Sequence, residues 1–229
     1  FGMGNYKDST LELLSNKGNG NYAYIDDFSE ARKVLVDQML GTMVTIAKDV
    51  KIQVEFNPAV VAGYRLIGYE NRMLKKEDFN NDKVDAGEIG GGHTVTALYE
   101  LIRVGKPFPD VLEVDELKYQ VPTSPAAGTT EALTVKMRYK EPDGDTSSKL
   151  EFPLTADELK RNDPSRDFRF ASAVAGFGML LRESDQRGSI SYDQVITLAE
   201  SALGDDRLGY RAEFVKLVRN AQAMKKSQD

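Results

Sequence analysis

The stretch Asp49–Phe56, DVKIQVEF, alternates polar and apolar side chains at every position. Because successive side chains of a β-strand point to opposite faces, this period of two predicts a strand with one buried face and one solvated face. Such strands are typical of antiparallel sheets, which cover a core on one side only. The stretch therefore predicts that the middle of the chain is built from antiparallel strands.

The same alternation recurs further along the chain. Five more stretches show it: residues 64–69, 94–101, 117–121, 133–140 and 150–154. Pro142-Asp143-Gly144, between the last two, predicts a turn and hence a hairpin. Six half-buried strands without a helix between them predict an antiparallel β-sandwich-like region over residues 48–155.

Both flanks of this region have the period of a helix, with apolar side chains recurring every three or four residues. Residues 8–17 and 28–46 predict helices, and Tyr22–Ile25 predicts a short strand between them. Residues 1–47 thus have the alternating order of an α/β domain. Residues 156–229 predict a three-helix tail that packs on the strands, so the expected fold class is α+β.

Composition excludes several classes of protein. The chain has 30 Lys and Arg against 36 Asp and Glu, a net charge of −6, which argues against a nucleic-acid partner. It has no Cys, and His93 is its only His, which excludes disulfides, thiolate sites and multi-His metal sites. The longest apolar stretch, 170–181, is shorter than the roughly 20 residues of a membrane-spanning helix. The chain starts at Phe1 without a targeting signal, so we expect any such signal upstream.

The richest polar cluster is the stretch 78–88, DFNNDKVDAGE, which we call the acidic loop. Oxygen-bearing side chains stand at alternate positions of its start: Asp78, Asn80 and Asp82. This spacing is that of the opening of a calcium loop, but Lys83 replaces the required Gly, and Glu88 stands one position early. Two interpretations stay open: a calcium site, and a loop between strands whose side chains bond nearby main-chain amides.

Gly90-Gly91-Gly92-His93-Thr94 lacks the Lys and the following helix of a phosphate-binding loop. It predicts a glycine bulge or a tight entry into a strand. His93 alone favours a structural role, while the alternative is a small ligand-binding or hydrolytic site formed with Glu88 and the acidic loop. The chain contains none of the common nucleophile or zinc-hydrolase motifs, so no catalytic residue and no cofactor other than Ca²⁺ is predicted.

Several long stretches together resemble one family. They are Asn16–Asp26, Ala47–Pro58, Tyr64–Arg72, Glu77–Glu100 and Asp167–Leu181. The resemblance is to bacterial von Willebrand factor type A domain proteins of the YfbK type, which carry a C-terminal domain of unknown function. It implies that residues 1–47 end a type A domain and that the rest is the family's own C-terminal domain. The family's Mg²⁺-binding D-x-S-x-S loop has no counterpart in this chain, so no metal ligand carries over.

The resemblance also implies a role and a place. We expect a non-enzymatic protein-interaction or scaffold module of the bacterial cell envelope, periplasmic or membrane-anchored through an upstream lipid signal. Its partners are expected to be proteins. Because part of an α/β domain exposes sheet edges and apolar faces, residues 1–47 are expected to be poorly packed or covered, and self-association through them is one way to cover them.

Overall fold

The computed structural model describes residues 7–18, 20–69, 73–106, 129–160 and 163–227. The fold is α+β, as predicted, with antiparallel sheets and a group of C-terminal helices. The chain divides into two compact units: unit 1 comprises residues 1–56, 73–95 and 133–153, and unit 2 comprises residues 57–72, 96–132 and 154–229. Since the units interleave along the chain, the domain boundaries expected after residues 47 and 155 stay predictions.

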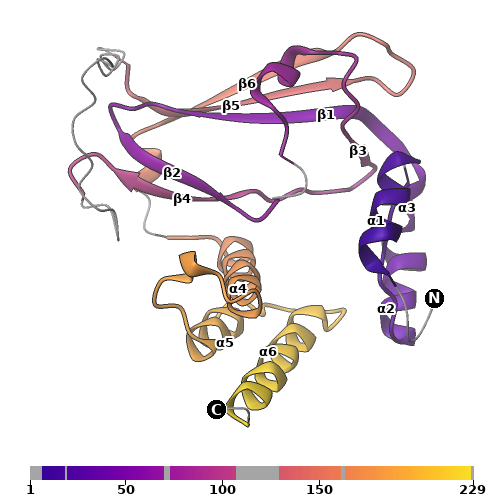
Figure 1. The fold of residues 1–229 in the computed structure, drawn as a ribbon, viewed down its shortest axis with the longest axis vertical. Helices are drawn as coiled ribbons and strands as arrows, with labels where there is room; N and C mark the ends of the chain where they lie inside the picture. The colour runs from indigo at the N-terminus through magenta and orange to yellow at the C-terminus, as the bar shows by residue number, and fades with distance from the viewer. Residues whose placement is uncertain (1–6, 19, 70–72, 107–128, 161–162, 228–229) are drawn as a thin grey trace. The chain divides into compact units, whose positions relative to one another are not determined.

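Unit 1 is built on a four-stranded sheet in the order β3-β1-β5-β6 (Figure 1). Its strands are β1 (Thr45–Phe56), β3 (Gly87–Gly90), β5 (Glu131–Lys140) and β6 (Ser148–Thr155). The first two residues of β5 and the last two of β6 belong to unit 2. β1 pairs antiparallel with both β3 and β5. The predicted turn joins β5 to β6, and the Gly144 amide donates to the Glu141 carbonyl across 2.9 Å. β3 was not predicted, because its four residues lie in a glycine-rich stretch without alternation.

The face of β1 predicted to be buried is wrong at Lys51 and Ile52, in the middle of the strand. Lys51 is only 3% exposed, whereas Ile52 is 43% exposed. The cause is the 3₁₀ turn Lys76–Asn80, which contacts β1 and whose Phe79 is buried. A β-bulge between Lys48 and Lys51 also interrupts the pairing of β1 with β5.

The N-terminal part of unit 1 consists of short helical pieces: α1 (Asp8–Lys17), α2 (Phe28–Arg32), a π-helical turn (Lys33–Asp37) and α3 (Met39–Met43). The helix at 8–17 is confirmed, but the continuous helix over 28–46 is wrong. The chain is already in β1 at Thr45, where it pairs with Gly90 of β3. The strand predicted at Tyr22–Ile25 is also wrong, since no described strand pairs with it.

Unit 2 contains a second antiparallel pair, β2 (Val61–Ile67) and β4 (Leu98–Arg103), and three helices, α4 (Arg166–Leu181), α5 (Tyr192–Glu200) and α6 (Tyr210–Lys226). It also has 3₁₀ turns at Glu158–Lys160 and Asp185–Arg187. The three-helix tail is confirmed, and the strand predicted at 94–101 begins only at Leu98. The strand predicted at 117–121 lies outside the described residues.

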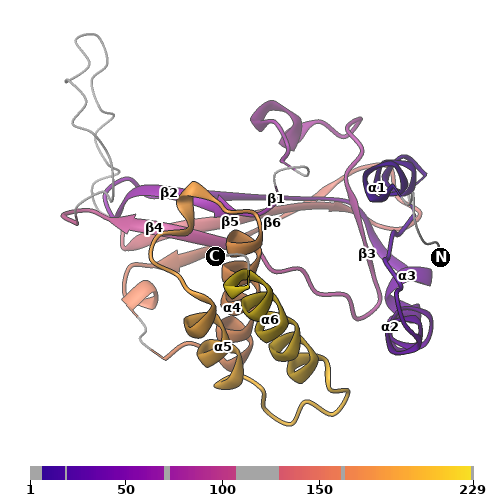
Figure 2. The ribbon, with the colours of Figure 1, turned by 60° about the horizontal axis from the view of Figure 1, so that its bottom comes forward.

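The three helices pack on one another, α4 against α5 and α5 against α6 (Figure 2). Their ends follow the capping rules: Ser165 accepts from the Phe168 amide, and Ser191 and Gln194 form a complete capping box. The buried side chains between the helices are Ala173, Phe177, Val195, Ala199, Val215 and Val218. In the described part of the chain, no helix has both the length and the apolar character needed to cross a bilayer.

Candidate functional site

The acidic loop lies over the polar face of β1 and β5 in unit 1, and Phe79 anchors it with a buried ring. Two cations beneath it are nearly inaccessible: Lys51 is 3% exposed, and Lys140 is 8% exposed. A buried charge is costly unless it is hydrogen-bonded, so the bonds of these cations decide what the loop is for.

The side chain of Lys51 holds the acidic loop by bonding to main-chain carbonyl groups of the loop. Its Nζ donates to the carbonyl oxygens of Asp78, at 3.3 Å, and Asn81, at 2.5 Å. Carbonyl oxygens of this kind are also ligands of hard cations such as Ca²⁺. In this loop an ammonium group of the protein itself bonds to them.

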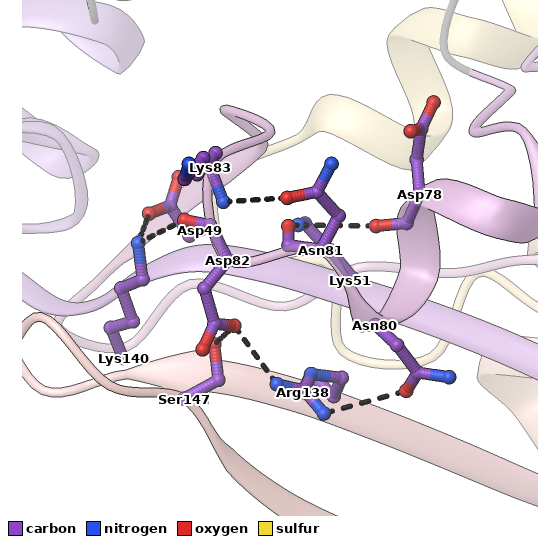
Figure 3. Close-up of polar contacts among 10 residues, drawn as sticks. All are labelled: Asp49, Lys51, Asp78, Asn80, Asn81, Asp82, Lys83, Arg138, Lys140 and Ser147. Atoms are coloured by element: carbon purple, nitrogen blue, oxygen red, sulfur yellow. Dashed lines mark hydrogen bonds and ion pairs between the residues drawn. The ribbon is translucent and has the colours of Figure 1, made fainter.

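Asp82 is held from two sides (Figure 3). Its Oδ1 accepts from Arg138 Nη2 at 2.8 Å and from Ser147 Oγ at 2.6 Å, and Lys140 Nζ donates to its carbonyl at 2.8 Å. Lys140 also donates to Asp49 Oδ2 at 2.6 Å. We call these residues, together with Lys51, the loop network: Asp49, Lys51, Asp82, Arg138, Lys140 and Ser147.

The left-handed backbone of Asp49, with φ 52°, lies within the bulge of β1. Asp tolerates this conformation better than most residues do. The Asp49 carboxylate accepts from Lys140 through Oδ2 and from the Ala86 amide, at 3.1 Å, through Oδ1. The bulge therefore places a carboxylate between the end of β5 and the end of the acidic loop.

The bonds of the network stabilise its charged forms. Hydrogen bonds from Ser147 and Arg138 lower the pKa of Asp82 from 3.8 to about 2. Burial alone would raise the pKa of Asp49, but the hydrogen bonds from Lys140 and Ala86 outweigh it, so the pKa is lowered. The same bond to Asp49 raises the pKa of Lys140 above its usual 10.5. These shifts favour the charged forms of Asp49, Asp82 and Lys140 at neutral pH.

The three residues predicted as calcium ligands do not converge. In Figure 3 the side chains of Asn80 and Asp82 extend to Arg138 from two sides, whereas the side chain of Asp78 points away from them. Arg138 donates to Asn80 Oδ1 as well as to Asp82. Among the described residues no group of three or more His, Asp or Glu side chains gathers as a metal site would require. Calcium binding stays a prediction, and a comparison of the melting temperature with calcium and with EDTA tests it.

The residues of the alternative site also lie apart. His93 is exposed, and its ring has no hydrogen-bond partner among the described residues. Glu88, in β3, accepts from Thr45 Oγ1 at 3.5 Å. A hydrolytic site would need His93 bonded to a carboxylate in a pocket, and this arrangement is not found in the part of the chain that the structure describes.

Sequence reasoning missed the cations of the loop network. Lys51, Arg138 and Lys140 stand at strand positions that alternation assigns to solvent, so no local signal marks them. It also missed a wide groove of about 780 Å³ in unit 2, between β4 and α5. The groove is open to solvent, and its lining includes Glu100, which Arg65 already binds.

The loop network makes the thermal stability of the protein depend on pH in the acidic range. Because the pKa of Asp82 is lower in the folded state, its contribution is complete above pH 3.8 and is lost as the pH falls toward about 2. We therefore expect wild-type thermal stability to fall more steeply between about pH 4 and pH 2 than that of Asp82→Asn, which cannot titrate there. Melting curves by circular dichroism at each pH measure this. Equal slopes for both proteins would refute it.

Comparison with known proteins gives a match over most of the chain. The family model described as the C-terminal region of the uncharacterized protein YfbK matches residues 41–224. The uncharacterized protein YfbK of Escherichia coli (strain K12) is 44% identical over 228 residues, which are 98% of this chain. The chain spans only 38% of the length of that relative. No solved structure matches the chain.

Proposed function

This chain belongs to the family of YfbK C-terminal domains, and from that membership we propose that it is a non-enzymatic interaction module of a bacterial cell-envelope protein. Its N-terminal segment, residues 8–44, is the surface through which it joins the part of the protein that precedes it. On the resemblance set out above, that preceding part is a von Willebrand type A domain.

The exposed apolar surface of residues 8–44 is the observation that carries the proposal. None of the described side chains in this segment is buried. Large apolar side chains are exposed along it, Phe28 at 85% among them; the others are Leu11, Leu13, Leu14, Tyr24, Leu35, Val36, Met39, Met43 and Val44. A concentration of exposed apolar side chains of this kind marks an interaction site.

The preceding part of the protein is the occupant that fits this surface best. The E. coli relative has 62% of its length outside the matched region, as the 38% coverage implies, and the matching family model describes a C-terminal region. The segment also leads directly into β1, which is central in the sheet of unit 1. A domain bound to residues 8–44 would therefore be coupled to that sheet through a short connection.

One further feature favours a binding role over catalysis. In the loop network, Arg138 and Lys140 bond to the carboxylates of Asp82 and Asp49, so the protein's own cations engage both carboxylates. The charges of the network hold a loop onto a sheet, which is a structural task.

We infer the envelope location and the lipid anchor from the family resemblance, and fractionation of cells that express the full-length protein tests both. Recovery in the cytosolic fraction would contradict them.

Hydrogen exchange measured by mass spectrometry tests the interaction surface. We expect amides of residues 28–44 to exchange more slowly in the full-length protein than in this chain, because the preceding domain covers them. The peptides of α4–α6 are the internal control and should exchange equally in both proteins. Equal exchange of residues 28–44 in both would overturn the proposal.

A further inference from the structure

Among the strands that the structure describes, β6 is an edge of the unit 1 sheet, with β5 as its one neighbour. Residues 148–153 are all exposed. Within the described chain, no main-chain bond leaves the outer edge of these residues. An exposed edge strand of this length offers its free N–H and C=O groups to another strand.

Bonds at the end of β6 show which residues face that edge. The Ala156 amide donates to the Thr130 carbonyl on the β5 side, at 2.9 Å, whereas the Thr155 amide donates to the Glu158 side chain. Because successive residues of a strand point their main-chain groups to opposite sides, Lys149, Glu151 and Pro153 face outward with Thr155.

The charges of the outward-facing residues of β6 complement those of the same residues in a second copy of the strand. Lys149 and Glu151 lie on the same face of the strand, since their side chains form an ion pair with 2.5 Å between Nζ and Oε1. If two copies of β6 pair antiparallel about a two-fold axis at Leu150, each Lys149 lies opposite the other copy's Glu151. Each of these two residues then exchanges both its main-chain hydrogen bonds across the axis, and opposite charges directly across a strand pair are stabilising.

Other registers of the two β6 strands are less favourable. An axis at residue 149 places Lys149 opposite Lys149, and an axis at residue 151 places Glu151 opposite Glu151, so like charges meet. An axis at residue 152 places Glu151 opposite Pro153, which has no N–H to donate. The charges and the proline thus select the register centred on Leu150.

The opposite face of β6 adds apolar area. Leu150 is 41% exposed and Phe152 is 49% exposed. With the axis at Leu150, the two Leu150 side chains lie directly opposite each other, and each Phe152 lies opposite Ser148 of the other copy. Both apolar side chains lose water-exposed area when the strands pair, which favours association.

We propose that β6 is a homodimerisation edge, and that its partner is β6 of a second copy of this chain, paired antiparallel about Leu150. The two sheets join into one continuous sheet through an isologous contact. Because a pairing of single edge strands buries little area compared with a stable dimer, the dimer dissociates readily and its population depends on protein concentration.

Charge-swapped variants test the register. In sedimentation velocity over a concentration series, we expect wild type to shift from monomer to dimer, and both K149E and E151K to stay monomeric because each places like charges across the axis. An equimolar mixture of K149E and E151K should restore the dimer, and so should the double variant K149E/E151K. All four positions of the paired strands then carry opposite charges again.

The control is E141K, which reverses an exposed charge of the β5–β6 turn without touching the edge. It should dimerise as wild type does, and melting curves should show every variant folded, since the changed side chains are exposed. A wild type that stays monomeric at all concentrations overturns the proposal. A dimer that persists in both K149E and E151K overturns it too, and assigns association to another surface, such as residues 8–44.

Discussion

Phe177→Ala is expected to lower the free energy of unfolding of the helical part of unit 2 by about 3–5 kcal/mol, the usual cost of deleting a buried phenylalanine ring. Phe177 is 5% exposed in α4. Its ring packs edge-on against Tyr192 of α5, at 6.3 Å between centroids, and Phe214 of α6, at 5.6 Å. It is the side chain through which the rings of all three helices meet, so its loss leaves a cavity between them.

Urea unfolding followed by circular dichroism at 222 nm measures this loss. The matched control is Phe168→Ala in the same helix, because Phe168 is 54% exposed and its deletion leaves no cavity. The control should change the free energy of unfolding by less than about 1 kcal/mol. If both variants lose the same amount, Phe177 does not have the role in the core that its burial indicates.

Lys51→Met is expected to lower the free energy of unfolding of unit 1 by about 2 kcal/mol. Met keeps the length and the apolar stem of Lys but removes the ammonium group that bonds to the carbonyls of Asp78 and Asn81. These two acceptors lose their partner beneath the loop. Because the loop network lies next to them, the acidic loop should also open locally before the whole unit unfolds.

Thermal unfolding and hydrogen exchange of peptides covering residues 76–86 measure the two effects. Lys83→Met is the matched control, since Lys83 belongs to the same loop but is exposed. We expect faster exchange of the loop in Lys51→Met and no change in Lys83→Met. Unchanged exchange in Lys51→Met would mean that the loop is held without its buried ammonium group.

The strands and helices that the sequence predicts best are those whose period is accompanied by a turn or a helix cap. The alternation in 133–140 and 150–154 and the turn between them give β5 and β6, and the capping box at Ser191 gives the start of α5. In these places a period of two or of 3.6, together with a turn or a cap, is enough to place the element along the chain. It does not decide burial, since Lys140 is buried and residues 148–153 are exposed.

The errors lie where distant segments compete with the local pattern. The helical stripe of 28–46 ends early because Thr45 pairs with Gly90, and Tyr22–Ile25 forms no strand because no described strand lies beside it. A strand exists only with a partner, so its sequence alone is an incomplete signal. The inward face of β1 was misjudged for the same reason, since a turn 25 residues later covers Lys51.

The acidic loop shows most clearly which features follow from the sequence and which from the tertiary structure. Residue types and spacing determine that the stretch 78–88 is rich in oxygen ligands that must find cationic partners. Only the tertiary structure decides which cations these are, because Lys51 precedes the loop by 27 residues and Arg138 follows Asp82 by 56. Hydrogen bonds act over about 3 Å, whereas sequence patterns report only on neighbours along the chain. The sequence thus determined β5, β6, the start of α5 and the charges of the acidic loop, and the packing of that loop across β1 and β5 decided which charges meet.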